Sequence, residues 1–322
     1  MSRATRIVRF AAGKLIAAAI TVWATTLIVF LSLYLVPGDP LSVLLRGRKP
    51  TPEVVAALRQ EYGLDQPLLV RYWDWFTGLL RGDLGFSIQH QTDVATVVAS
   101  RLPTTLWLVA YAAIIIVVVG VLLGIWSAVT TRRSVTHGIL LGTSVLSAIP
   151  AFVAALLLML VFSGALGWFP AFGSGDATFA SRIQHLTLPA FALALTYIGL
   201  IARVTANSLK HEIGSDHVQA ARIRGLSGGY LFRHHVLRNG LNPILSYGGV
   251  LVAGLLVTSQ LVEYAFGLNG IGRLLVESVR NIDFAVVQIV TILIVVSFIV
   301  TNTIVDLIAP LINPQLRDRV SS

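Results

Sequence analysis

The stretch Pro103–Trp126, PTTLWLVAYAAIIIVVVGVLLGIW, contains no charged residue. A bilayer core about 30 Å thick is crossed by about 20 helical residues, and ionisable side chains are costly inside it. This stretch is therefore predicted to be a membrane-spanning helix. The whole chain is similarly apolar, since 55% of its 322 residues are hydrophobic and only 12% are charged, whereas an ordinary soluble domain carries about 25% charged residues.

Five further stretches meet the same test. The sequence thus predicts an all-α membrane protein with six transmembrane helices, at about residues 15–36, 103–126, 138–163, 186–203, 244–263 and 287–309. Basic residues precede the first stretch, as they would in a signal peptide. Its charge-free run reaches Gly38, however, which is well beyond the 7–15 residues of a signal's apolar region. We expect it to be a retained helix.

The distribution of Lys and Arg predicts the orientation, because cytoplasmic segments retain positive charge. With the N-terminus inside, the cytoplasmic segments hold 14 of the 24 basic residues but only four of the 15 acidic ones. The expected organisation is then a cytoplasmic N-terminus at 1–14, a six-span domain at 15–309 and a cytoplasmic tail at 310–322. Within the domain lie an external loop at 37–102 and a cytoplasmic loop at 204–243.

Several other functions are disfavoured by composition. The net charge is +9, but the basic residues lie between apolar stretches instead of forming one exposed face, so membrane lipid is expected as a partner and nucleic acid is not. Lys occurs only at positions 14, 49 and 210, and none ends a phosphate-binding glycine loop. The chain is therefore expected to bind no ATP or Mg²⁺ and to have no catalytic residue. Cys is absent, and the seven His residues form no metalloprotease-type pair, so no metal site is expected.

Some residues within the spans invite a role. The pairs Gly120 with Gly124 and Gly138 with Gly142 are spaced to let helices approach closely, although ordinary membrane glycines would look the same. Four polar residues are candidates for the pathway or for contacts between helices: Ser259, Gln260, Asn302 and Asp306. Asn302 and Asp306 lie four residues apart, and a structural polar clamp is favoured there over a transport role.

The external loop is predicted to contain short helices. Thr51 and Gly63 have the residue types that start and end one helix, and a second is expected from Pro67 to near Gly82. The second carries Tyr72, Trp73, Trp75 and Phe76. Such aromatic side chains settle at a membrane interface or form a docking surface for a protein, and interface packing is favoured.

The cytoplasmic loop is predicted to contain a helix of about two turns. Asp216 can cap it while Gln219 reaches back, and Gly225 suits the left-handed turn that ends a helix. Its small residues, Ala220 and Ala221, would let a partner's groove close onto the backbone. Ser227 can start the next helix.

These motifs resemble those of ABC importer permeases. Gln219-Ala220-Ala221 followed by Gly225 is similar to the EAA loop, with Gln where Glu is usual, and Gly225-Leu226-Ser227 is similar to the version in the dipeptide, oligopeptide and nickel permease family. Further matches, in order along the chain, are Pro37-Gly38-Asp39-Pro40, Gly63-Leu64-Asp65-Gln66-Pro67 and Gly82-Asp83-Leu84-Gly85.

The resemblance implies a type I ABC importer permease fold in a bacterial inner membrane, with both termini cytoplasmic. It further implies a second homologous permease, one or two ATP-binding subunits that bind ATP and Mg²⁺, and an extracytoplasmic solute-binding protein. The coupling residues would be Asp216, Gln219, Ala220, Ala221, Gly225, Leu226 and Ser227. Peptides are the expected cargo, while a nickel chelate and glutathione remain alternatives within the family. A six-span channel is the alternative from a different class.

Overall fold

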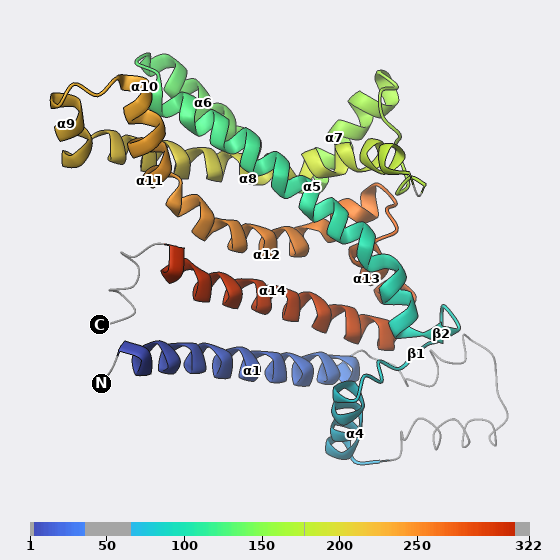
Figure 1. Cartoon of the computed structure of the whole chain (residues 1–322). Coiled ribbons are helices and arrows are strands. Elements are labelled where there is room, and N and C mark those ends of the chain that lie inside the picture. Colours follow the sequence, from blue (N-terminus) through green and yellow to red (C-terminus); the bar gives the residue numbers. More distant parts are fainter. Residues whose placement is uncertain (1–2, 36–65, 177, 313–322) are drawn as a thin grey trace.

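The computed structural model describes residues 3–35, 66–176 and 178–312, and these are mostly helical (Figure 1). The elements, in chain order, are α1 (Arg3–Leu35), α4 (Leu68–Leu80), β1 (Phe86–Ser87), β2 (Thr92–Asp93), α5 (Val94–Val129), α6 (Arg133–Ala148), α7 (Ala151–Leu158), η1 (Met159–Ala165), α8 (Phe179–Ile213), α9 (Asp216–Ile223), α10 (Gly228–Leu231), η2 (Phe232–Leu237), α11 (Arg238–Gly240), α12 (Asn242–Ala265), α13 (Ile271–Arg280) and α14 (Phe284–Ile312). The helix expected between Thr51 and Gly63 lies outside the described residues.

The long helices run between two ends of the molecule (Figure 1). The start of α1, the end of α14 and the short helices α9–α11 lie at one end, and α4, the β1–β2 hairpin and α13 lie at the other. The hairpin is a two-residue antiparallel pair in which Phe86 faces Asp93 and Ser87 faces Thr92. The predicted cytoplasmic loop, the start of α1 and the described end of α14 therefore share one end.

The described residues contain four helices long and apolar enough to cross a membrane, or five if one bent pair is a single span. The four are Ala12–Ser32, Val94–Val129, Phe179–Ile213 and Phe284–Ile304. In α12, the described apolar stretch Val250–Ala265 is too short to meet this test. The count of six therefore stays a prediction.

The third predicted span, 138–163, is not one straight helix. Its two parts, Arg133–Ala148 and Ala151–Ala165, meet at 97°. Ile149 has an extended backbone (φ −77°, ψ 122°), as expected of a residue before proline, and Pro150 has no backbone N–H to continue the helix. A hydropathy count cannot detect this break, because Ile149 and Pro150 leave the window apolar.

The helices α5 and α8 form the most extensive pair and exceed their predicted spans of 103–126 and 186–203 at both ends. The start of α8 is set by Thr178, whose side chain accepts a hydrogen bond from the backbone N–H of Ser181 at 3.3 Å. The apolar run thus locates a span, but polar caps decide where its helix begins. The domain boundaries drawn from hydropathy remain predictions.

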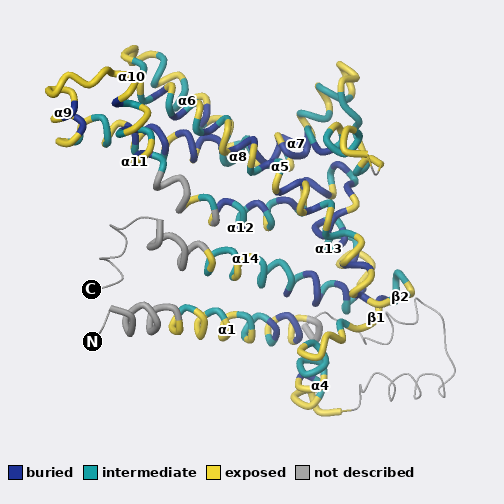
Figure 2. Tube along the Cα trace, in the orientation of Figure 1, coloured by how far each residue is buried: buried dark blue, intermediate teal, exposed yellow. Residues whose placement is uncertain are grey.

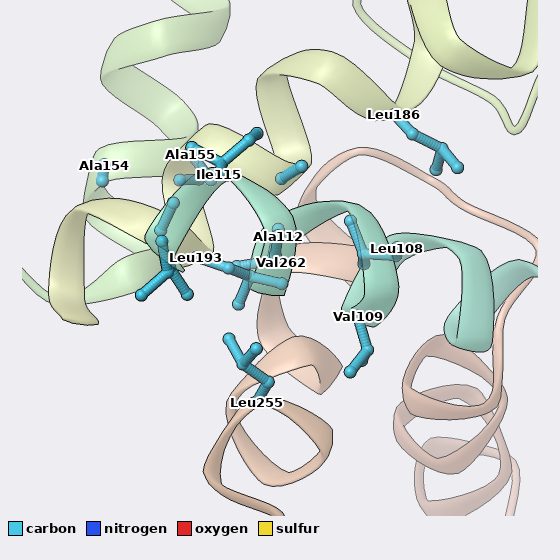
Figure 3. Close-up of a cluster of buried hydrophobic side chains, with 14 of the residues drawn as sticks. Leu108, Val109, Ala112, Ile115, Ala154, Ala155, Leu186, Leu193, Leu255 and Val262 are labelled. Atoms are coloured by element: carbon cyan, nitrogen blue, oxygen red, sulfur yellow. The ribbon is translucent and has the colours of Figure 1, made fainter. Parts of the chain in front are cut away.

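The largest buried cluster lies where α5, α7, α8 and α12 meet (Figures 2 and 3). A Cβ added at Gly120 would come within 2.9 Å of the side chain of Ile201, and one at Gly124 would overlap Thr205. These glycines therefore let α5 and α8 approach closely. Gly138 and Gly142 face open space in this chain, since no atom lies within 4 Å of an added Cβ.

Candidate functional site

The N-cap of α9 is Ser215, one residue before Asp216, which the sequence predicted as the cap. Ser215 has an extended backbone, and its carbonyl accepts the first helical hydrogen bond from the N–H of Gln219 at 3.1 Å. Ser215 is thus the N-cap residue. Asp216 is the first helical residue, where its charge still suits the positive helix end. Gln219 does not form the predicted capping-box bond, since its Nε2 donates to the carbonyl of Gly214 at 3.1 Å instead of its oxygen accepting from the cap residue's N–H.

The C-terminus of α9 is closed by a left-handed turn at Gly225, whose φ is +80°. The N–H of Gly225 donates to the carbonyl of Arg222 at 3.0 Å, and that of Leu226 donates to the carbonyl of Ala221 at 3.4 Å. These are the two bonds of a Schellman motif. An added Cβ would meet no atom within 4 Å, so backbone conformation, not space, favours glycine here.

The two alanines of α9 lie on different sides of the helix. Ala221 and Val218 are buried in a cluster with Leu209, Leu231 and Val236. Ala220 is exposed, and Ile223 is 87% exposed (Figure 2). Successive helical residues are 100° apart, so the expectation that both alanines face a partner is wrong. The exposed surface of α9 includes Ala220 and Ile223 together with polar residues such as Gln219 and Arg222.

A carboxylate at the end of α8 connects three helices. Glu212 Oε1 lies 2.9 Å from His217 Nε2 on α9, and it accepts a hydrogen bond from Asn239 Nδ2 on α11 at 3.1 Å. Glu212 thus joins α9 and α11 to the end of α8, which packs closely along α5 at Gly120 and Gly124.

A second polar node lies at the opposite end, around Glu263, which is fully buried. Its Oε1 accepts a hydrogen bond from Thr105 Oγ1 at 2.7 Å, and its Oε2 accepts from the backbone N–H of Gly272 at 2.7 Å and of Arg273 at 3.2 Å. Thr105 Oγ1 accepts in turn from the N–H of Ile271 at 2.8 Å. The cap position of α13 is a glycine without a side chain to bond these donors, so α12 and α5 cap α13 in its place.

A third contact fixes the hairpin to the turn between α13 and α14. Asp283 Oδ2 accepts a hydrogen bond from Ser87 Oγ at 2.5 Å and from the N–H of Gln89 at 3.3 Å. The preceding Ile282 has φ +56°, which is unusual for a β-branched residue. Asp283 thus holds the hairpin against the end of α13, and Glu263 caps the start of the same helix.

Two family models cover nearly the whole chain. One, described as "Binding-protein-dependent transport system inner membrane component", matches residues 120–318, and its N-terminal companion matches residues 7–109. The chain belongs to this family of ABC importer permeases.

Named relatives of this permease align along almost all of their length. The glutathione transport system permease protein GsiC of Salmonella choleraesuis (strain SC-B67) is 37% identical over 298 residues, covering 92% of this chain and 95% of the relative. The protein of that name from Escherichia coli (strain K12) is 35% identical over 299 residues, covering 92% and 95%.

Two solved structures share the fold. A chain of the MetNI methionine ABC transporter in an inward-facing conformation gives a TM-score of 0.57 at 16% identity, covering 67% of this chain and 96% of that one. A chain of an amino acid ABC transporter with histidines gives 0.53 at 18% identity, covering 67% and 94%. The permease fold expected from the sequence is confirmed, and the protein is a multi-pass component of the inner membrane.

The pathway candidates of the permease do not gather in one place. Ser259 is fully buried and donates to the carbonyl of Leu256 at 3.1 Å, and Gln260 lies against Gly272 where α12 meets α13. Asn302, on α14, donates from Nδ2 to the carbonyl of Phe298 at 3.0 Å. The side chain of Asp306 lies outside those described, so its pairing with Asn302 stays a prediction.

Ser259 does border a cavity. The space measures about 60 Å³ and lies between α5, α12, α13 and α14, with Thr105, Ser259 and Ser297 as its polar lining. Glu263 is the residue that sequence reasoning missed beside it. A signal was available, because a carboxylate at the end of a predicted span is rare unless it has partners.

Proposed function

We propose that this permease forms half of an ATP-driven import pathway for small peptides, with glutathione as one candidate cargo. Support for the cargo comes from the relatives named for glutathione transport, which align over 95% of their own length. In this proposal an extracytoplasmic solute-binding protein delivers the peptide. A second homologous permease completes the pathway, and one or two partner subunits bind ATP and Mg²⁺.

The observation that carries the coupling role is the two-sided packing of α9. Its inner side is anchored by Val218 and Ala221, and its ends are fixed by the Gly225 turn and by the contact between His217 and Glu212. Its outer side offers Ala220 and an almost fully exposed Ile223. A small residue beside an apolar one fits a cleft in a partner protein, where a few buried apolar anchors carry most of the binding energy.

Orientation belongs to the same proposal. We place α9 and both termini in the cytoplasm and α4, the β1–β2 hairpin and α13 outside, on the basis of the Lys and Arg distribution. Only 11% of the most apolar window of α1 is buried within this chain, so most of this helix is left to contact lipid or a second subunit.

The proposed function is tested by reconstituting the four-component system in proteoliposomes. We expect uptake of labelled dipeptides, tripeptides or glutathione only when ATP, the binding protein and all subunits are present. Uptake of a nickel chelate, with no uptake of peptide or glutathione, would show that the cargo is a nickel chelate. Ion conduction by this chain in the absence of the ATPase would favour a channel.

The docking role of α9 is tested in the same system with Ala220→Trp. The added bulk on the outward side should abolish assembly or uncouple ATP hydrolysis from uptake. Ala180→Trp is the matched control, because Ala180 is also an exposed helical alanine but lies at the far end of α8. Wild-type uptake by Ala220→Trp would show that α9 does not receive the ATPase.

A further inference from the structure

The helix α4 has an apolar stripe that is largely exposed in the described part of the chain, with Phe76 half-buried. Leu69, Trp73, Phe76 and Leu80 recur at intervals of three and four residues, so they share one side of the helix. Leu69 is 71% exposed, Trp73 54% and Leu80 72%. The side turned away from the stripe and from α1 carries Arg71, Asp74 and Thr77, together with Val70 and Gly78.

The next side of α4 packs on α1. Tyr72 is buried, its hydroxyl lies 3.0 Å from Thr26 Oγ1, and Phe30 lies 5.5 Å from the rings of both Tyr72 and Trp75. The packed side and the exposed stripe together form one continuous apolar sector, and Figure 1 shows α4 running across the end of α1, not alongside it.

These contacts place α4 against the last turns of α1. Thr26 and Phe30 both lie within ten residues of Leu35, the last residue of α1. A helix that crosses the end of a membrane-spanning helix lies near the boundary between headgroups and acyl chains, which is where an interfacial helix buries its apolar face.

We propose that α4 is an interfacial helix whose Leu69–Trp73–Phe76–Leu80 stripe inserts into the lipid of one membrane leaflet. The stripe continues the lipid-accessible surface of α1, where Ile28 is 67% exposed and Leu31 36%, while the polar side faces water. Trp73 suits this position, since tryptophan is enriched at the level of the headgroups. The leaflet is the outer one under the proposed orientation. Insertion itself requires only that α1 crosses the membrane.

The test uses the assembled transporter in lipid nanodiscs, with single-cysteine spin labels at Leu69, Leu80 and, as the control on the polar side, Asp74. The natural chain has no cysteine, so no background site needs removal. Labels at Leu69 and Leu80 should collide often with oxygen and rarely with a water-soluble nickel chelate, and the label at Asp74 should show the reverse.

Two outcomes would overturn the proposal. Protection of the stripe from both reagents would mean that a protein subunit covers it, and free access of the nickel chelate would mean that it faces water. A second measurement needs no variant, because a photoactivatable phospholipid in wild-type transporter should leave adducts within residues 68–80. Neither experiment measures transport, so a result against lipid insertion would not bear on the proposed function.

Discussion

Gly225 is the residue whose backbone most directly fixes α9, because its φ of +80° is costly for any residue with a Cβ. We expect Gly225→Ala to destabilise the end of α9 by about 1–2 kcal/mol. Hydrogen exchange of residues 216–226 should then rise, and ATP hydrolysis should be less tightly coupled to uptake.

The matched control for that substitution is Gly228→Ala. Gly228 also has no atom within 4 Å of an added Cβ, but it begins the helix α10, where alanine is well tolerated. Equal exchange in the two variants would show that the left-handed turn does not stabilise α9.

Glu263 is the residue that we expect to matter most at the α13 end of the molecule. Glu263→Gln replaces an acceptor oxygen with an NH₂ group, which must face either Thr105 or the N–H groups of α13. Leaving buried donors without an acceptor costs about 1–3 kcal/mol, so the thermal midpoint of the purified transporter should fall.

Glu277→Gln serves as the control for Glu263→Gln. Glu277 accepts a hydrogen bond from Arg273 Nε at 2.6 Å across one helical turn, but its side chain is 25% exposed. Pairs of this kind contribute about 0.3–0.5 kcal/mol, so the midpoint should hardly move. A fall as large as that of Glu263→Gln would contradict the proposed cap.

Single residues could be predicted from the sequence only where their signal comes from neighbouring residues. The turn at Gly225 could be predicted because its signal is local. The partners of Glu263 and Asp283 could not, since Thr105 is 158 residues from Glu263 and Ser87 is 196 from Asp283. Likewise, the cap lies at Ser215 and not at Asp216 because Ser215 has the extended backbone that precedes the helix. Composition does not reveal this backbone conformation.

At the scale of elements, substitutions on the two sides of α9 should have different effects. Ala221 is only 8% exposed, and bulk inserted into a packed contact costs about 1–3 kcal/mol. Ala221→Trp should therefore loosen α9 in this chain even without ATPase, visible as faster hydrogen exchange of residues 216–223. Ala220→Trp should leave that exchange unchanged and fail only when the partner is added. Unchanged exchange in Ala221→Trp would show that α9 is not anchored through its inner side.

Elements were predictable to different degrees, for physical reasons. Long apolar helices such as α5 and α8 follow from hydropathy, since the membrane imposes their length. The break at Pro150 and the short helix α13 depend on proline geometry and on capping from other helices. An apolar window does not contain that information.

The whole molecule depends on the number and direction of its membrane crossings. The segment formed by α6, α7 and η1 decides the number of crossings, because its 97° bend suits either a broken span or a re-entrant loop. The residues that flank this segment distinguish the two. In a broken span, Arg132 and Asp176 lie on opposite sides of the membrane. In a re-entrant loop they lie on the same side. Figure 1 shows this segment running from the α9 end to the opposite end, which favours a broken span.

Cysteine labelling settles both questions at once in a chain that has no cysteine. Single cysteines at Arg81, Arg132, Asp176 and Arg222 occupy exposed sites and would meet an impermeant maleimide only on the outer face of right-side-out vesicles. We expect labelling at Arg81 and Asp176, with Arg132 and Arg222 reacting only after permeabilisation. The reverse pattern at all four would invert the orientation. Equal labelling of Arg132 and Asp176 would convert the third span into a re-entrant loop, and the chain would then lack the sixth crossing that places both termini beside α9.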